Sequence, residues 1–463
     1  MRITVALLGI RRCVPLNLDP PGRAAARLVS PAKMWQPTPD RVFCHDGGMA
    51  LEITAVRPDP ALLDLPWSTP LEDWPEERLA ALPRGISRHI VRFVRVPEGV
   101  VAIKEIKDEI AFREYHMLRA LNRLMIPCVR PYGVVSGRVG ADGEPLDSCL
   151  ITHHLQYSLP FRALFSQTLR PDTATRLIDA LAVLLVRLHL QGFWWGDVSL
   201  SNTLFRRDAG AFAAYVVDAE TGELRDRLSD GQRDHDLDIA RVNTAGELMD
   251  LEAGGLLPEG NDPVEISNQI MARYTQLWHE LTGVESYNVG ERWRVDERIR
   301  QLNQLGFDVD ELAMSTDIDG TTLRIQPKVV DAGHHSRRLL RLTGLDVEEN
   351  QARRLLNDLD AYRAALDVQG EDEAITATRW LNEIFLPITR AIPADLRGKL
   401  EPAELFHELL EHRWYLSERN GHDVPIGQAM ADYILTILPT KPVEETVVGV
   451  DTVEMPVVAH LDD

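Results

Sequence analysis

Three oxygen-bearing side chains stand at a spacing that suits phosphoryl transfer. Asp197 is followed, after four intervening residues, by Asn202, and the apolar run 215–217 then leads to Asp218. Phosphoryl transfer needs a carboxylate to orient the attacking hydroxyl and oxygen ligands to hold Mg²⁺ on the phosphates. This set offers both kinds of group. The alternative is a loop whose Asp and Asn serve only turns and helix caps.

A lysine upstream of this set could contact phosphate oxygens. The β-branched run 100–106 contains Lys104 and predicts a strand. A phosphate-binding lysine needs a carboxylate partner on the next helix. The predicted helix 109–124 offers Glu109 and Glu114. The alternative for Lys104 is a solvated lysine on an edge strand.

The order of these parts resembles the protein-kinase-like superfamily. Val-Ala-Ile-Lys at 101–104 is similar to its phosphate-binding strand motif. Trp-Gly-Asp at 195–197 is similar to the His-Gly-Asp of the lipopolysaccharide-kinase and aminoglycoside-phosphotransferase branches, and Asp-Ala-Glu at 218–220 to their metal-binding turn. Asp-Ile-Ala at 238–240 resembles a later element that supports the catalytic loop. The kinase resemblance covers about 51–283.

With its C-terminal extension, the chain resembles a bacterial family in which a lipopolysaccharide-kinase-like domain is joined to a domain of unknown function. The resemblance implies that Lys104, positioned by Glu114 rather than the earlier glutamate, holds the α- and β-phosphates of ATP. Asn202 and Asp218 would hold Mg²⁺, and Asp197 would orient the acceptor hydroxyl as catalytic base.

Other residues are expected to support the loop and cover the phosphates. Support of the catalytic loop is assigned to Asp238 and Trp195, the latter standing where the family usually has His. No glycine-rich motif precedes Lys104, because the corresponding stretch 83–89 holds a single glycine. Glycines let backbone N–H groups approach phosphates. In their place we expect a cover built from Gly85, Ser87 and Arg88.

These assignments predict an ATP- and Mg²⁺-dependent phosphotransferase. Its acceptor is expected to be a hydroxyl of a sugar, glycolipid or other small molecule, by analogy with the nearest branches. The alternative is a pseudokinase, a nucleotide-binding scaffold or regulatory module, which the missing glycine-rich loop and Trp195 favour. A third possibility is a helical interaction module, and a protein partner of the C-terminal part is open in each case.

Composition narrows the class of protein. The 463 residues allow two or three domains, and 44% hydrophobic with 26% charged residues is ordinary for a globular protein. The net charge of −21 argues against broad contact with nucleic acid or an anionic membrane. The four cysteines lack metal-ligand spacing. No apolar run approaches the roughly 20 residues of a membrane span, so we expect a cytoplasmic protein.

The predicted fold class is α+β, a bilobal protein-kinase-like fold followed by a mainly α-helical C-terminal domain. Residues 1–48, rich in Pro and Arg, are expected to be a disordered extension, and Met49 is a candidate start of translation. The kinase-like domain is expected over 49–286, with the small lobe ending at about 153. A helical domain of unknown function over 287–440 and an acidic flexible tail over 441–463 complete the chain.

Periodicity places the elements around the site. Helix 173–191 is expected to deliver the catalytic loop and to end at Gly192. In a helix over 229–250, Asp234 is suited to capping and Asp236 to the first turn. The alternative there is a metal cluster. Strands and C-terminal helices are predicted as follows: strands 89–96, 100–106, 129–135, 148–153 and, until Pro327, 321–330; helices 292–305, 347–366, 373–386, 402–418 and 426–438.

Two groups of basic or imidazole side chains are less decisive. His153 and His154 are adjacent on an extended segment and would point opposite ways, which argues against a shared metal site. A set of cations in the C-terminal part could form a pocket for an acidic acceptor, although solvated salt bridges are the simpler interpretation. The set is Lys328, His335, Arg337 and Arg413.

Overall fold

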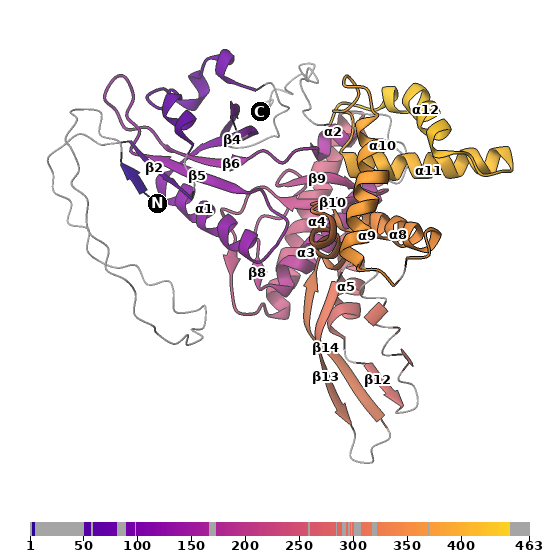
Figure 1. Ribbon diagram of the computed structural model, residues 1–463. Coiled ribbons are helices and arrows are strands. Elements are labelled where there is room, and N and C mark those ends of the chain that lie inside the picture. The colour runs from indigo at the N-terminus through magenta and orange to yellow at the C-terminus, as the bar shows by residue number, and fades with distance from the viewer. Residues whose placement is uncertain are drawn as a thin grey trace, which may run out of the picture.

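The computed structural model describes most of the chain. The described residues are 2–4; 51–283 except for 57–58, 81–88, 98, 166–172 and 258–259; 285–288; five residues between 293 and 300; 307–316; and 322–444 except for 369. They form two lobes and a C-terminal set of helices (Figure 1). The predicted α+β class is confirmed, with antiparallel sheets in the N-terminal part and helices in the C-terminal part.

An antiparallel sheet of six strands forms the small lobe. Helix α1 (Asp108–Arg123) packs against one face of it. Residues 2–4 of the segment that was predicted to be disordered form a strand of this sheet, and 5–50 lie outside the described residues. In spatial order the strands are β1 (Arg2–Thr4), β2 (Glu52–Ala55), β5 (Pro131–Ser136), β6 (Ser148–His153), β4 (Gly99–Ile106) and β3 (Ile90–Val96).

The two faces of β4 have different tasks. Val101 and Ile103 are fully buried in a cluster with Trp67 and Trp74, which lie in the segment before β3. Because successive strand residues point to opposite faces, Lys104 projects to the other face. Within the sheet, β4 pairs with β6, and Lys104 lies opposite Leu150 in the register of these two strands. The alternation therefore directs the lysine away from the apolar cluster and toward the larger lobe.

The large lobe is built on α3 (Thr173–Leu190), whose leucines are buried in the main apolar cluster. Helix α3 ends before Gly192, as predicted, and the chain continues into the catalytic loop. Helices α4 (Asp230–Ala253) and α5 (Pro263–Thr282) pack beside α3 and each other. The shorter elements are β7 (Ser158–Pro160), α2 (Phe161–Phe165), β8 (Phe193–Trp194), β9 (Thr203–Asp208), β10 (Ala211–Val216) and β11 (Glu223–Leu224).

A three-stranded sheet precedes the C-terminal helices, with β14 (Thr322–Ala332) between β12 (Glu285–Asn288) and β13 (Phe307–Thr316). The strand does not end at Pro327, contrary to the sequence prediction. Among the described residues, strand β12 pairs with 322–325 only, so Pro327 has β13 on one side and no described strand on the other. A proline is tolerated at such an edge position.

Helices α8, α11 and α12 lie close to the predicted ranges 347–366, 402–418 and 426–438, whereas α7 was not predicted and the predicted helix 373–386 contains a π-helical turn. Most of the predicted helix 292–305 lies outside the described residues. The C-terminal helices enclose two apolar clusters of their own, one around Trp380 and Phe406 and one around Leu409 and Tyr433. No described helix combines the length and the apolar composition that a membrane crossing requires. The elements are α7 (His334–Thr343), α8 (Glu349–Ala365), α9 (Glu373–Trp380), a π-helical turn (Leu381–Phe385), α10 (Leu386–Arg390), α11 (Pro402–Asn420) and α12 (Ile426–Thr436).

Candidate active site

A cavity of about 890 Å³ is lined by residues of both lobes. Strands β3, β4 and β6 supply one wall, and the segment 197–204 with α4 supplies the opposite wall. All of the residues that the sequence assigned to base, metal and lysine–glutamate roles line this cavity. They are Lys104, Glu114, Asp197, Asn202 and Asp218.

Lys104 lies at the centre of an acidic cluster. Its Nζ is 3.1 Å from Glu114 Oε2, 2.7 Å from Asp218 Oδ2 and 3.2 Å from Glu220 Oε2. Glu114 comes from α1, whereas Asp218 and Glu220 come from the turn after β10. The lysine–Glu114 pair expected from the sequence is therefore present. The side chain of Glu109 starts on the same helix, but the contact is made by Glu114.

Burial and charge shift the pKa of both members of this pair. Burial alone would lower the pKa of Lys104, but the Glu114, Asp218 and Glu220 carboxylates outweigh it and hold that pKa above its ordinary value. Burial raises the pKa of Glu114 to about 8; Asp218 adds to the rise and Lys104 opposes it. Asp218 and Glu220 place two further acidic groups beside the single ammonium of Lys104, an arrangement that favours an additional cation.

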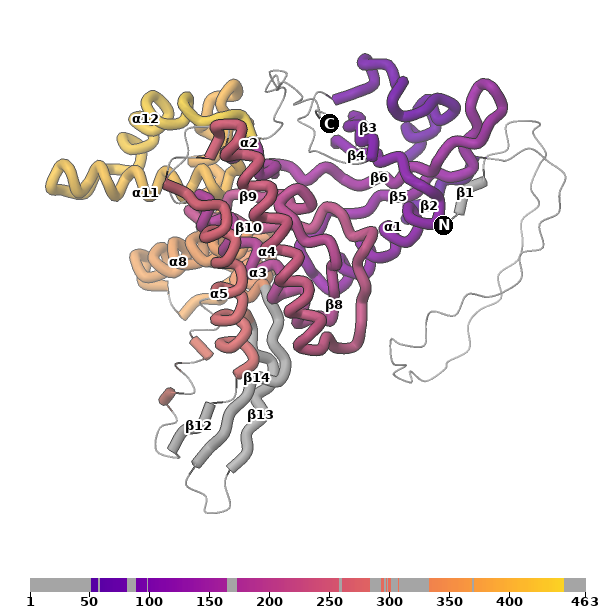
Figure 2. The backbone as a smooth tube through the Cα atoms, turned by 180° about the vertical axis from the view of Figure 1, so that it is seen from behind, coloured from indigo at the N-terminus to yellow at the C-terminus, as the bar shows by residue number. Residues whose placement is uncertain are grey.

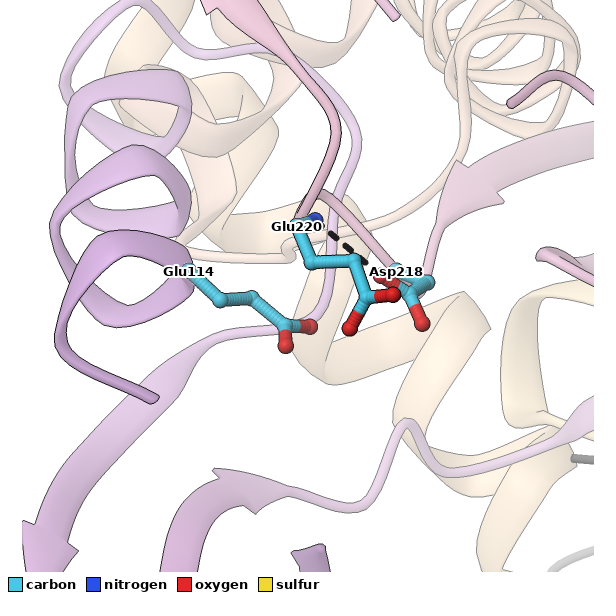
Figure 3. A group of neighbouring side chains, drawn as sticks. All are labelled: Glu114, Asp218 and Glu220. Atoms are coloured by element: carbon cyan, nitrogen blue, oxygen red, sulfur yellow. Dashed lines mark hydrogen bonds between the residues drawn. The ribbon is translucent and has the colours of Figure 1, made fainter. Parts of the chain in front are cut away.

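The carboxylates converge on one another as well as on the lysine. Figure 3 shows Glu114 reaching from its helix toward Asp218 and Glu220. The backbone N–H of Glu220 donates to Asp218 Oδ1 at 3.0 Å. Ligand atoms of the three side chains lie within 4.8 Å of one another, and within the described part of the chain no other group of three or more does so. Carboxylate oxygens suit hard cations such as Mg²⁺.

Asp197 and Asn202 face each other across the catalytic loop. Asn202 Nδ2 donates to the backbone carbonyl and to Oδ2 of Asp197, both at 3.0 Å. The loop is closed by Ser199, whose Oγ accepts from Asn202 N at 3.1 Å. These bonds fix the amide group of Asn202 relative to the Asp197 carboxylate.

Tryptophan, not histidine, braces this loop. Trp195 is fully buried, and its indole Nε1 donates to the backbone carbonyl of Asp218 at 2.7 Å. Gly196 has a φ of 77°, and a Cβ there would lie 2.9 Å from the Trp194 ring. Glycine is therefore required directly before Asp197. Trp195 thus braces the loop as expected, and it links 195–202 to the turn that holds Asp218 and Glu220.

The assignment of Asp238 to the catalytic loop is wrong, because Asp236 makes that contact. Asp236 accepts from Trp195 N and Gly196 N, both at 2.7 Å, and lies 3.2 Å from His189 Nε2. Asp238 is exposed and contacts only Arg241 among the hydrogen-bond partners seen for it. Helix α4 turns its buried face toward the loop, and position 238 falls on the opposite side of the helix.

The start of α4 also differs from the sequence prediction. Ser229 is the N-cap, and it forms a capping box with Gln232. Asp234 and Asp236 therefore lie inside the helix, and neither caps it. Because the helix begins at Asp230, Asp236 lies beyond its first turn and falls within the buried stripe that includes Leu237 and Ala240.

Two further residues of α4 hold the loop and were missed from the sequence. Glu247 accepts from Leu200 N at 2.7 Å and Ser201 N at 2.8 Å. Asn243 Nδ2 donates to the carbonyl of Val198 at 3.0 Å. Both residues lie next to the apolar stripe of the helix in the sequence. A polar side chain buried there without a hydrogen-bond partner would be unfavourable, so its position could have indicated a partner in the loop.

The cavity also reaches the connection between the lobes, where its lining includes His153 and His154. His153 packs against Tyr132 and His154 against Phe93. Burial lowers the pKa of each histidine to about 4, so both are neutral near pH 7. The expected phosphate cover, Gly85, Ser87 and Arg88, lies outside the described residues. Apolar residues that line the cavity are Ala102, Leu150, Leu155, Leu204 and Val217.

The basic pocket considered for the C-terminal part is not at this cavity. His335, Arg337 and Arg413 do not line it, and the side chain of Lys328 lies outside the described residues. Arg413 Nη2 donates to both carboxylate oxygens of Asp423, at 2.9 and 2.8 Å. An ordinary salt bridge, the simpler interpretation, thus accounts for Arg413.

Comparisons with known proteins agree with the motifs. Residues 100–245 match the lipopolysaccharide kinase (Kdo/WaaP) family, and 276–438 match a domain of unknown function, DUF4032. No curated protein matches the chain. A solved structure titled "WaaP in complex with acyl carrier protein" is similar at 16% identity and a TM-score of 0.31, over 53% of this chain and 97% of that chain. Along the chain, a region that matches the lipopolysaccharide kinase (Kdo/WaaP) family is thus followed by a region that matches DUF4032.

Proposed function

We propose that the protein is an ATP- and Mg²⁺-dependent phosphotransferase that acts on a hydroxyl of a sugar, glycolipid or other small acceptor. The observation that carries this proposal is the convergence of Lys104, Asp197, Asn202 and Asp218 on one cavity. The family match supports a kinase-like phosphotransferase. The apolar lining residues offer a place for a nucleotide base, and the acidic cluster offers a place for phosphates with their cation.

Each side chain has a task that follows from its position. Lys104, held by Glu114, would neutralise phosphate oxygens. Asp197, oriented by Asn202, would accept a hydrogen bond from the acceptor hydroxyl and take its proton as the oxygen attacks phosphorus. The neutral histidines at the lobe connection avoid adding positive charge to the cavity.

The residues present fit a magnesium ion. The donor set of Asp218 and Glu220 carboxylates and the Asn202 amide oxygen is composed of hard oxygen ligands. These three side chains surround a surplus of negative charge, which disfavours the site without a cation. When bound, the ion would supply charge neutralisation to the phosphates. The same donor set would also favour Mn²⁺.

A thermal-shift titration with ATP tests the nucleotide site. We expect the melting temperature to rise with ATP only when Mg²⁺ is present, because Mg²⁺ neutralises the cluster. A ligand that binds only the native state adds about 2.7 kcal/mol at roughly 100 times Kd. The control is Asp218→Ala, in which the Mg²⁺-dependent rise should vanish. Absence of any shift at millimolar Mg·ATP would contradict the proposal and favour a non-nucleotide scaffold.

The Asp197→Ala variant separates binding from transfer. It should keep the Mg·ATP-dependent rise in melting temperature, because the residue faces the acceptor. Turnover with sugar and glycolipid acceptors should fall by about 100-fold or more, the usual contribution of a general base. Nucleotide binding without turnover in the wild-type protein would instead identify a pseudokinase.

A further inference from the structure

A single hairpin joins the two side chains proposed to bind metal. Strand β9 begins directly after Asn202, and β10 ends two residues before Asp218. At the open end of the hairpin, Val217 N donates to the carbonyl of Asn202 at 3.1 Å. The position and twist of the β9–β10 hairpin therefore set where Asn202 and Asp218 lie relative to each other.

The closed end of the hairpin is a tight two-residue turn. Ala209 and Gly210 have φ angles of 50° and 87°, and Asp208 pairs with Ala211. Positive φ at both positions is typical of the turns that connect two-residue hairpins. The Ala209 N–H donates to Glu404 Oε2 of α11 at 2.8 Å. The C-terminal helices thus contact the tip of the hairpin.

One glutamate of the C-terminal helices contacts both strands. Glu348 lies directly before α8 and caps it. Its Oε1 lies 2.8 Å from Arg206 Nη1 on β9 and accepts from Tyr215 Oη on β10 at 2.5 Å. Glu401, which precedes α11, also pairs with Arg206. The side chains of Arg206, Glu348 and Glu401 are 14%, 10% and 14% exposed, so the pairs are largely shielded from solvent.

In return, the hairpin caps a helix of the C-terminal part. Asp208 is buried and accepts from Gln351 N at 2.8 Å and from Asn350 Nδ2 at 2.9 Å, both in the first turn of α8. Gln351 Nε2 donates to the carbonyl of Arg207 at 3.0 Å and to Glu404 at 3.0 Å. A carboxylate at a helix N-terminus is favourable, so hairpin and helix stabilise each other.

These contacts form an interface of buried, mutually paired polar groups. Removing one partner of such a pair would leave the other charge buried and uncompensated, which is strongly unfavourable. Both views of the chain place α8 and α11 beside the hairpin (Figures 1 and 2). The hairpin is therefore held from outside by helices, while its open end carries the proposed ligands.

We propose that the C-terminal helices, residues 334–444, hold the β9–β10 hairpin so that Asn202 and Asp218 keep the separation needed to bind Mg²⁺. Arg206 and Tyr215 act as positioning residues through Glu348. The inference rests on the proposed function and assigns a role to the region of unknown function. Mg²⁺ demands nearly ideal octahedral geometry, so a small shift of one ligand weakens its binding.

The test compares two glutamates with matched partners in the full-length chain. Glu348 is bonded to Arg206 and Tyr215 of the hairpin. Glu408 accepts from Lys441 at 2.7 Å and from Tyr433 Oη at 2.8 Å, both within the C-terminal part. Nucleotide binding is measured with ATP at increasing Mg²⁺ for Glu348→Gln and Glu408→Gln. The Mg²⁺ concentration for half-maximal ATP binding should rise about 10-fold or more in Glu348→Gln and should change less than about twofold in Glu408→Gln.

Amide hydrogen exchange gives a second readout that needs no nucleotide. Exchange at 199–204 and 216–220 should be faster in Glu348→Gln than in Glu408→Gln. Should Glu348→Gln fail to fold, Tyr215→Phe removes the β10 contact alone and should move both readouts in the same direction. Equal Mg²⁺ dependence and equal exchange in the two glutamate variants would overturn the proposal. A wild-type protein that binds no Mg·ATP would overturn the proposed function. Amide hydrogen exchange would then still test whether the C-terminal helices hold the β9–β10 hairpin.

Discussion

Among the side chains around Lys104, Glu114 differs from the other two carboxylates. Its side chain is 2% exposed, whereas those of Asp218 and Glu220 are 22% and 24% exposed. A buried carboxylate is suited to hold the lysine, and the more open pair to exchange the lysine for a cation. All three groups are carboxylates, so only their burial distinguishes the proposed positioning role of Glu114 from the proposed ligand role of the other two.

The pH dependence of stability should report on Glu114. Its folded-state pKa of about 8 exceeds the ordinary value of 4.5, so its contribution is fully present below pH 4.5 and is lost as pH rises through 8. Lys104, with its raised pKa, stays protonated over this range. In Glu114→Gln this titration is absent. The unfolding free energy of the wild type relative to the variant should fall by roughly 3–4 kcal/mol between about pH 5 and pH 8.

Urea unfolding at several pH values measures this difference. A difference that stays constant with pH would mean that Glu114 titrates normally. Comparison with the variant at each pH removes the contributions of other acidic groups, because they are the same in both proteins.

The residues nearest to the chemistry could be predicted from the sequence because their spacing is local. Asp197, Asn202 and Asp218 lie within one loop and one hairpin, and Lys104 lies in a recognisable strand. Glu220 entered only as part of the Asp-Ala-Glu match, and its contact with Lys104 at 3.2 Å was not foreseen. Such a contact depends on how two lobes meet, which no local pattern specifies.

At the scale of elements, α4 acts as the support of the catalytic loop. Asp236 holds the residues before Asp197, and Glu247 holds those after Val198. Both side chains lie on the buried face of the helix, three turns apart. The loop is therefore fixed on each side of the proposed base by one rigid element.

A pair of substitutions on α4 tests this support. Asp236→Asn replaces one accepting oxygen with an amide that faces a backbone N–H, and leaves a buried donor unsatisfied. We expect a loss of roughly 1–3 kcal/mol in unfolding free energy, measured by urea denaturation. Asp238→Asn, on the exposed face, should change it by less than about 0.5 kcal/mol. Equal losses in the two variants would restore Asp238 as the supporting residue.

The sequence prediction of Asp238 failed for an identifiable reason. A motif was matched by its letters, but the phase of the helix decides which residue faces the loop. Leu237, Ala240, Thr244 and Leu248 define the buried stripe, and Asp236 lies within its span. Reading that stripe together with the Ser229 cap would have indicated Asp236. By contrast, helix α3 was predicted well because its apolar face is continuous.

At the scale of the whole molecule, the excess of acidic residues governs the response to salt. The net charge is −21. Raising the ionic strength from 0.01 M to 0.15 M shortens the Debye length from about 30 to 8 Å and screens the repulsion between like charges. The melting temperature should therefore rise with NaCl over this range. Glu348→Gln should show the same rise, because its ion pair is shielded from solvent.

A melting temperature that falls with salt would show that surface ion pairs outweigh the net repulsion.

The lobes and the C-terminal helices follow from composition and periodicity, but their mutual placement does not. Arg206 and Glu348 look like ordinary exposed charges in the sequence, and only the fold brings them to 2.8 Å. Domain boundaries near 286 and 440 remain predictions for the same reason.

The distance along the chain between the hairpin and its helical support has a consequence during synthesis. Asp208 and Gln351 are separated by 143 positions. The hairpin itself can close within microseconds. At about 5–20 residues per second of translation, its partner helix emerges on the order of 10 s later. We expect a nascent chain to carry all of the residues proposed for catalysis well before their geometry is complete, so that activity would begin only when nearly the whole protein has been made.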